Sequence, residues 1–499
     1  SKSITSVGTS MPVLTVLLGV MALTACSWQA GRQADSPTPP TLALPNAWHY
    51  AAQSPSVSEQ LSASTPCVVS ERTHDVQYCN DSWWQLFNDD RLNTFMVDLL
   101  AHNKELDTAT LNLQKSLLAA KKDSQALTPS INTTAEARTG QEYRPKTDER
   151  TSSQNASLAL NASWELDLWG RLTEQRLASQ YEMQAVAADR QGVYMSLTAG
   201  AVRQYLQLAL LNEQLITSKQ TLDYLHNLHR MQSIRLRAGQ VAPIDLISTR
   251  QAITQHQQAE LTLITQKDEL LTVLAVLFNL PTAEVANTWH DVRLPKTDLP
   301  AVAVGLPAST LANRPDMQMA TWRLQSALLM PSIAKKSLYP NIVLTAGAGS
   351  SSSQLTEILK IPVLNWGLAI NLPPLNPQEA KRTLQTAKIN EQEAIISYQN
   401  SVYKALADVE SKLAQFTHQQ QNSWLALQNM QNSDTLLSAN RIRYQAGVLS
   451  VKELLDSEES HRQATFTTLS SQLNQYLAWI ALYQALGGEM EAEIGDELL

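Results

Sequence analysis

The residues whose type and spacing could support chemistry are few in this sequence. His226 and His229 lie three positions apart on a segment expected to be helical, so both could reach one metal ion, but no third ligand lies nearby. A solvated helix face is the simpler interpretation. The chain carries no phosphate-binding loop, no Gly-x-Ser-x-Gly nucleophile and no paired catalytic carboxylates. We therefore predict that the protein is not an enzyme and has no metal or cofactor site.

Cys26 follows a short apolar segment, residues 11–23, which is itself preceded by Lys2. An apolar run of this length is typical of the core of an export signal and is too short to span a membrane as a helix. Residues 23–26, Leu-Thr-Ala-Cys, resemble a bacterial lipobox, which predicts lipid attachment at Cys26 and removal of residues 1–25. An ordinary signal peptide with an incidental cysteine is the alternative. No other run of 18 apolar residues occurs, so no transmembrane helix is expected.

Residues 26–80 are rich in proline and serine, which predicts an extended amino-terminal tether; a low-complexity linker is the alternative. This segment contains the other two cysteines, Cys67 and Cys79. In an exported protein these two residues could form one disulfide bond, and two free thiols are the alternative.

The composition favours helix and argues against one class of partner. Charged residues make up 17% of the chain, below the roughly 25% that is usual for soluble domains, and only 16 of the 499 residues are glycine. The formal net charge is −8 and the isoelectric point is about 5.7. Because nucleic acids select basic surfaces, we expect no nucleic-acid partner.

The second half of the chain resembles the first. Residues 235–247 and 443–455 both begin with Arg-x-x-Ala-Gly, so Gly239 aligns with Gly447 at an offset of about 208 positions. A second match, Leu-x-Pro-x-Ile at residues 127–131 and 338–342, has nearly the same offset. We therefore predict a tandem duplication, with a first unit at residues 81–290 and a second unit at residues 305–490.

Each unit is expected to open with a helix and to continue with two strands. The opening helices are predicted at residues 92–127 and 309–336. Apolar and polar residues then alternate, which is typical of membrane-barrel strands with lipid on one face and water on the other. A soluble sheet with one wet face is the alternative. The predicted strands are residues 131–139, 158–168, 342–350 and 364–372, and polar loops are expected at residues 140–154 and 351–360.

Two long proline-free tracts follow the strand pairs, at residues 172–235 and 379–443. At 1.5 Å per residue, the first would be about 95 Å long as a helix. Each tract ends at an Ala-Gly pair, where glycine can take the left-handed conformation that ends a helix. Return helices are expected to start at acidic residues and to run to residues 278 and 486. Arg235 with Asp245, and Arg443 with Glu453, could form charge links across these tips; solvated helix caps are the alternative.

These elements predict an oligomeric conduit. Four strands cannot close a membrane barrel, because open edges leave backbone groups unpaired in lipid, whereas a trimer supplies twelve strands and a dimer eight. Helices of about 95 Å fit neither one globule nor a membrane about 30 Å thick. They must therefore project as a helical tube from the barrel. The expected fold is mainly α-helical with a membrane β-barrel.

Four further motifs occur in order along the chain. They are the Trp-Trp segment at 83–89, the Trp-Glu-Leu-Asp-Leu-Trp-Gly-Arg segment at 164–171, Asn-Arg-Pro-Asp at 313–316, and Arg-Tyr-x-Ala-Gly at 443–447. Together they resemble the motifs of the outer membrane factor family, the TolC-like proteins, and within it the NodT-type efflux lipoproteins. The resemblance covers nearly the whole chain after Cys26. One departure is that residues 373–378, after the fourth strand, read Pro-Pro-Leu-Asn-Pro-Gln where the family has Phe-Asp-Gly-Gly, so the glycine turn is absent.

The resemblance implies a lipid-anchored outer-membrane protein whose trimer forms a twelve-strand barrel continuous with a long periplasmic helical barrel. It implies the exit duct of a tripartite efflux pump, which passes small molecules such as drugs from a periplasmic adaptor and an inner-membrane transporter. A duct for type I protein secretion or for metal-cation efflux is the alternative, and a structural lipoprotein coiled coil is a further rival. The adaptor is expected to contact the tips at Ala238, Gly239, Val241, Ala446, Gly447 and Leu449, although these glycines could serve only as helix terminators.

Overall fold

The protein is described here by a computed structural model that covers residues 44–45, 47–50, 57–58, 82–145, 148–296, 299, 302–303, 307–352, 362–372 and 376–488. The chain divides into two compact units. The first includes Asp123–Ala178 and Leu328–Gln385, and the second comprises Thr41–Lys122, Ser179–Ala327 and Thr386–Leu499. The predicted lipidation and disulfide sites at Cys26, Cys67 and Cys79 lie outside the described residues and stay predictions.

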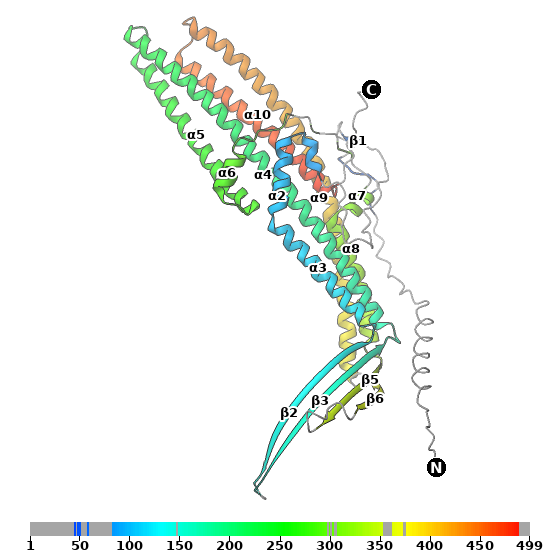
Figure 1. Ribbon diagram of the computed structural model, residues 1–499. Helices are drawn as coiled ribbons and strands as arrows, with labels where there is room; N and C mark the ends of the chain where they lie inside the picture. The colour runs from blue at the N-terminus through cyan, green and yellow to red at the C-terminus, as the bar shows by residue number, and fades with distance from the viewer. Residues whose placement is uncertain are drawn as a thin grey trace, which may run out of the picture. The chain divides into compact units, whose positions relative to one another are not determined.

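The first unit contains an antiparallel sheet of four strands in the order β2-β3-β5-β6. β2 and β3 form the longest hairpin (Figure 1). The predicted polar loop at residues 140–154 was wrong, because most of it belongs to these two strands. Its residues lack apolar alternation, and cross-strand backbone hydrogen bonds extend the hairpin without it. The strands are β2 (Ser130–Arg144), β3 (Glu149–Leu166), β5 (Asn341–Ser352) and β6 (Pro362–Asn371).

The strand register gathers apolar side chains on one face of the sheet. Leu160 of β3 pairs with Ala348 of β5, which pairs with Leu364 of β6. Side chains alternate between faces along every strand, so these positions share a face with their neighbours two residues away. The predicted alternation is therefore confirmed in three dimensions. Large exposed side chains on this face are Ile131, Leu158, Leu160, Trp164, Leu364, Trp366, Leu368 and Ile370.

The opposite face of the sheet is polar and carries a row of amides at one level. Asn132, Asn161, Gly347 and Asn365 pair successively across all four strands. A Cβ atom added to Gly347 would overlap Asn365 Oδ1 and would lie 3.0 Å from Asn161 Oδ1. Glycine at this position therefore makes room for two asparagine side chains that lean over it.

Two helical hairpins dominate the second unit (Figure 1). In the first hairpin α4 (Arg171–Arg237) is followed by α5 (Pro243–Phe278), and in the second α9 (Pro377–Gln445) is followed by α10 (Val451–Ala485). α4 has 67 residues and α9 has 69, so each is about 100 Å long at 1.5 Å per residue. The predicted long helices and return helices are confirmed to within two or three residues.

Both predicted opening helices were wrong as single helices. The first is divided into α2 (Asp90–His102) and α3 (Lys104–Gln125), and the second into α7 (Pro307–Asn313) and α8 (Pro315–Lys336). Asn103 ends the first helix, and its side-chain oxygen then accepts the N–H groups of two residues at the start of α3. In the second case Pro315 disfavours helical geometry at the residue before it.

Aromatic side chains fill the core of the second unit. The 3-10 helix η2 (Trp83–Phe87), which periodicity did not predict, inserts three buried aromatic residues. Trp83 stacks on Tyr483 of α10 with ring centroids 4.9 Å apart. Phe95 of α2 meets Trp289, which ends the short unpredicted helix α6 (Thr282–Trp289), at 5.1 Å. A further small element is the parallel pair of β1 (Val57–Ser58) with β4 (Val302–Ala303).

Within the described residues, each helix on its own is too short or too polar to cross a membrane. α5 and α6 meet the length and hydropathy criteria only as a pair, and a bend of 109° separates them.

Candidate functional site at the helical hairpins

The two hairpin tips have the same backbone geometry. Gly239 has φ +70° and Gly447 has φ +73°, the left-handed conformation that ends a helix and that suits glycine. In each tip the glycine N–H and the next N–H donate to carbonyls three and five residues back, at 2.9–3.0 Å. A Cβ atom at either glycine would meet nothing within 4 Å. Backbone conformation, not crowding, therefore requires glycine here.

Acidic residues cap both return helices. In the second hairpin the N–H of Glu453 donates to Ser450 Oγ at 3.2 Å, while the N–H of Ser450 donates to the Glu453 carboxylate at 3.0 Å. This reciprocal pair is a capping box. In the first hairpin Ala242 has no side-chain acceptor, so only the bond from its N–H to Asp245 Oδ2 forms, at 3.3 Å. In the second hairpin, the hydrogen bonds that Ser450 donates to the Glu453 carboxylate hold the pKa of that carboxyl below its usual range. The positive charge of Arg443 lowers this pKa further.

The four predicted charge-link residues do not pair directly. Within the described part of the chain, no ion pair of 4 Å or less joins Arg235 to Asp245 or Arg443 to Glu453. Arg235 instead lies over the ring of Tyr444, 5.5 Å from its centroid, and donates to the Tyr444 hydroxyl at 3.4 Å. The two carboxylates are occupied as helix caps, which corresponds to the alternative considered from the sequence.

Near the tips the two hairpins pack on each other through a small apolar cluster. Leu228 of α4 contacts a group formed by Leu437, Tyr444, Val451 and Leu454 of α9 and α10. The buried side chain of Gln232 donates from its amide nitrogen to the Tyr444 hydroxyl. The Gln232 amide oxygen has no hydrogen-bond partner. Tyr444 therefore links α4 to α9 at the level of the tips.

An ion pair between a half-exposed arginine and a buried glutamate lies one to two turns from the same end. Arg441 of α9 binds both carboxylate oxygens of Glu458 of α10, at 2.8 and 2.9 Å. The Arg441 guanidinium also lies 4.8 Å over the ring of Tyr224 on α4. Burial and the Glu458 charge raise the pKa of Tyr224 to about 12. The sequence did not reveal this cluster, because its three members come from three different helices.

The surface of the tips is exposed and carries apolar side chains among polar ones. Of the six predicted contact residues, Ala238, Gly239, Ala446 and Gly447 are exposed, while Val241 and Leu449 are half-buried. Large apolar side chains surround them in exposed positions, and Ile234 and Ile442 occupy matching places in the two hairpins. Water-exposed apolar groups at the end of a helix pair are suited to contact with another protein. The exposed apolar residues near the tips are Met231, Ile234, Ile244, Ile247, Ile442 and Val448.

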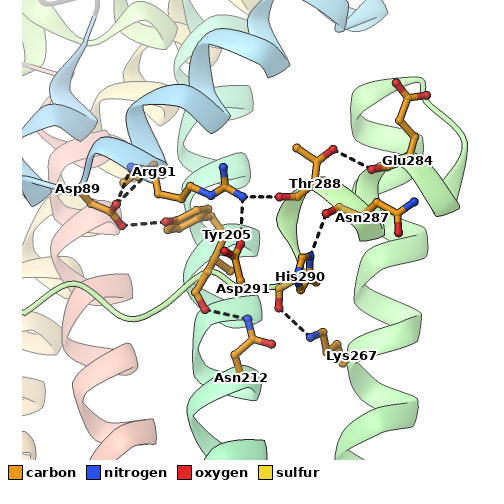
Figure 2. A network of polar contacts seen from close by, with 12 residues as sticks. Asp89, Arg91, Tyr205, Asn212, Lys267, Glu284, Asn287, Thr288, His290 and Asp291 are labelled. Carbon is orange, nitrogen blue, oxygen red and sulfur yellow. Dashed lines mark hydrogen bonds and ion pairs between the residues drawn. The ribbon is translucent and has the colours of Figure 1, made fainter.

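The base of the first hairpin is tied to the short helices by a polar network (Figure 2). Asp89 Oδ1 caps α2 by accepting the N–H groups of Arg91 and Leu92 at 2.9 and 3.2 Å. Its other oxygen accepts the hydroxyl proton of Tyr205 on α4 at 2.8 Å. Burial and the Asp89 charge raise the pKa of Tyr205, so the hydroxyl keeps its proton and continues to donate.

Arg91 continues this network to the segment that follows α6. Its guanidinium donates to Asp291 Oδ1 at 3.0 Å (Figure 2). The same guanidinium lies 4.7 Å over the ring of Trp289. The hydrogen bond from Arg91 lowers the pKa of the Asp291 carboxyl. Asn212 of α4 donates to the Val292 carbonyl at 2.8 Å. These contacts hold the α6 segment against α2 and α4.

The two hairpins are anchored at their bases by joints of the same construction. Asn103, which precedes α3, donates to the Leu277 carbonyl in the last turn of α5 at 3.0 Å. Arg314, which precedes α8, donates to the carbonyl of Ala485 at the end of α10 at 2.8 Å. In both cases the residue that precedes α3 or α8 donates a side-chain hydrogen bond to a backbone carbonyl that has no partner within the return helix. The common construction agrees with the predicted repeat, which stays a prediction.

Arg314 also forms ion pairs with two carboxylates in the second half of the chain. It binds Asp316 through two bonds of 3.0 and 2.8 Å, and Asp408 of α9 through one bond of 3.0 Å. Burial alone would lower the pKa of Arg314, but the two carboxylates raise it, and Arg314 in turn lowers the pKa of the Asp316 carboxyl. Gly487, which has φ +84°, lies close to the backbone beside Arg314. A Cβ atom at this position would lie 2.8–2.9 Å from the backbone of residues 313–314, so no larger residue fits there.

In the first unit, the junctions between strands and long helices are capped by side chains. Asp167 accepts the N–H groups of Leu172 and Thr173 at 3.0 and 2.8 Å, which starts α4. At the other junction Asn376 accepts the N–H groups of Gln378 and Glu379 at 3.2 and 3.3 Å, which starts α9. An asparagine cap therefore begins this helix where the sequence lacks the expected glycine turn.

One of the two histidines with metal-compatible spacing contacts a threonine of the return helix. His229 Nδ1 lies 3.0 Å from Thr249 Oγ1, and burial lowers the pKa of the His229 imidazole. Among the residues that the structure describes, no three His, Cys, Asp or Glu side chains are grouped as metal ligands would be.

Comparison with known proteins gives one consistent result. The sequence model of the family described as "Outer membrane efflux protein" matches residues 96–279 and 306–488, together more than half of the chain. Pyoverdine export outer membrane protein OpmQ of Pseudomonas putida is 27% identical over 487 residues, covering 95% of this chain and 96% of that protein. Cation efflux system protein CusC of Escherichia coli (strain K12) is 26% identical over 444 residues, covering 87% and 93%.

The fold is shared with solved structures. The crystal structure of the Campylobacter jejuni CmeC outer membrane channel matches with a TM-score of 0.75 and 20% sequence identity, covering 91% of this chain and 95% of that one. At this identity the likeness shows the fold alone.

Proposed function

Because the chain belongs to the outer membrane efflux protein family, we propose that it is the outer-membrane exit duct of a tripartite efflux pump. Its cargo is a class of small molecules delivered from the periplasm. The names of the two relatives above refer to different cargoes, pyoverdine in one case and cations in the other. In this proposal the partners of the duct determine which cargo it receives. Metal cations are the alternative cargo class.

The observation that carries this proposal is the sheet of the first unit. One face exposes Leu364, Trp366, Leu368 and Ile370 to the surroundings, with Trp366 88% exposed. Burial of such a face needs an apolar medium, and lipid supplies one. The two outer strands, β2 and β6, each pair on one side only within the described sheet. Unpaired edges are costly in lipid, so the sheet is completed by further copies of the chain.

Three copies complete the duct in this proposal. Three sheets of four strands form a closed wall of twelve, with the polar face and its asparagine row lining the bore. The hairpins of α4–α5 and α9–α10 then extend the bore into the periplasm as a helical barrel. Lipid attached to Cys26 anchors the mature chain in the outer membrane.

The adaptor docks at the hairpin tips. The exposed side chains there, among them Ile234 and Ile442, offer an apolar contact surface at both tips. The open space around Gly239 and Gly447 allows a partner helix to approach closely. The chain has a transport role without chemistry of its own, and an inner-membrane transporter supplies the energy.

Conductance in lipid bilayers tests this proposal. The purified protein is expected to insert and to give discrete current steps. Trp366→Lys puts a charge on the apolar face and is expected to reduce insertion, with a cost of about 2–4 kcal/mol at mid-membrane. Asn365→Lys, its neighbour on the polar face, is the matched control and is expected to insert normally with altered ion selectivity. Equal insertion of both variants, or absence of current from the wild type, would contradict the proposal.

Cargo class requires a separate experiment. Deletion of the gene followed by a susceptibility panel of drugs and metal cations distinguishes the two cargoes. Sensitivity to drugs alone supports the main proposal, and sensitivity to metals alone supports the alternative.

A further inference from the structure

The two hairpins of one chain meet along a seam between α5 and α10. Ile253 of α5 packs against Leu222 and Leu225 of α4, and Leu455 of α10 packs on the same cluster. About one turn further along α5 is His256, whose side chain is only 10% exposed. An imidazole is therefore buried at the contact between the two hairpins.

His256 faces a carboxylate that already has another partner. Its Nε2 lies 3.4 Å from Glu459 Oε2 on α10. The two oxygens of Glu459 accept bonds from Arg462 at 2.6 and 2.8 Å, in a bidentate pair. The side chain of Arg462 is 13% exposed and lies 4.7 Å over the ring of Phe466. Glu459 is therefore shared between one permanent cation and one residue that becomes cationic on acidification.

The charged groups around His256 come almost entirely from α10. This helix contributes Lys452, Asp456, Glu458, Glu459 and Arg462 to a cavity of about 510 Å³ that His256 also lines. Glu458 is neutralised by Arg441 of α9. From α4 only the apolar Leu225 faces the cavity, and α5 itself adds uncharged side chains at Ser248, Gln251, Ala252, Gln255 and Ala259.

We propose that His256 makes the seam between the two hairpins acid-sensitive: protonation puts a second cation beside Arg462 on a ring that is buried, and α5 and α10 loosen against each other. The charged form is disfavoured in the closed seam because burial and Arg462 oppose it and only Glu459 favours it. Consistently, burial and the Arg462 charge hold the pKa of His256 below its usual value, against the opposite effect of Glu459.

The sign of the effect follows from this balance. The closed seam prefers neutral imidazole, so its stability is fully present above the ordinary histidine pKa of about 6.5. It falls as pH drops below that value, because the opened seam takes up the proton first. Acidification therefore favours opening near the tips. The consequence for the duct, a change in aperture or docking, rests on the proposed function; the opening of the seam does not.

Hydrogen–deuterium exchange on the intact protein in detergent tests the inference directly. After correction for the intrinsic pH dependence of exchange, amides of α5 and α10 around His256 and Glu459 are expected to exchange at least about threefold faster at pH 5.5 than at pH 7.5. His256→Gln is expected to abolish the difference. The control is His418→Gln, on an exposed position of α9, which is expected to retain it.

A second variant keeps the test decisive if His256→Gln folds poorly. Glu459→Gln removes the one group that favours the charged imidazole in the closed seam, so its exchange at pH 5.5 is expected to exceed that of the wild type, while its exchange at pH 7.5 stays close to it. A wild type without a pH effect, or a His256→Gln protein that keeps the full effect, would overturn the inference. Since exchange needs no current, an acid-sensitive seam in a protein that fails to conduct would refute the duct proposal alone.

Discussion

Replacement of Arg314 by methionine is expected to destabilise the helical unit strongly. The buried guanidinium makes four hydrogen bonds, two to Asp316, one to Asp408 and one to the Ala485 carbonyl. Methionine fills similar space but donates none of them. The carbonyl then loses its partner, and α8, α9 and α10 lose their common link.

The size of this loss in unfolding free energy depends on how exposed the two carboxylates that Arg314 binds are. Removal of one member of a fully buried ion pair costs about 3–5 kcal/mol. Here Asp316 is 55% exposed and Asp408 is 41% exposed, so water recovers part of their solvation. The orphaned carbonyl adds about 1–3 kcal/mol. We therefore expect a loss of roughly 2–4 kcal/mol, or about 3–6 °C in Tm for a unit of this size at about 2.1 cal/mol/K per residue.

Thermal denaturation followed by circular dichroism measures this loss, and hydrogen exchange locates it. Protection is expected to fall at the start of α8 and the end of α10. Arg323→Met is the matched control, since Arg323 has a half-exposed side chain and one ion pair of 3.7 Å to Glu182. An Arg314→Met protein that melts within 1 °C of the control would show that Arg314 does not hold these helices together.

Three further outcomes are expected. Gly447→Ala puts a side chain on a residue with φ +73° and should lower the free energy of unfolding by about 1–2 kcal/mol. Gly200→Ala, inside α4 with open space around it, should raise the free energy of unfolding by about 0.5–1 kcal/mol. Urea denaturation compares the two variants, and equal effects would contradict the argument. Trp83→Ala should lose about 3–5 kcal/mol in the same assay, and a loss below 1 kcal/mol would mean that the aromatic core repacks. Because Arg314 lowers the pKa of Asp316, this pair stabilises the fold above about pH 4 and loses its effect as pH falls through the lowered pKa; Asp316→Asn should flatten the acid limb of the stability curve, and an unchanged limb would argue against the assignment.

Much of the fold could be predicted from the sequence, since local patterns determine it. Proline-free tracts ending at Ala-Gly predicted α4 and α9 and their tips, and glycine φ values of +70° and +73° give the physical reason. Alternation at residues 158–168 predicted which face of β3 is apolar. The polar half of the β2–β3 hairpin escaped prediction, because its strands are specified by cross-strand pairing and not by hydrophobic contrast.

The functional contacts depended on tertiary structure. Arg441, Glu458 and Tyr224 lie on three helices, and no spacing within one helix indicates that they meet. The same holds for His256 and Glu459, which are about 200 positions apart and become neighbours because two hairpins pack side by side. Conversely, Arg235 and Asp245 were close enough in sequence to suggest a pair, yet helix capping and a nearby aromatic ring engaged them separately. Turn and helix geometry are local and are determined by the sequence itself, whereas long-range pairing of charges is decided only when the packing of the hairpins determines which helix faces meet.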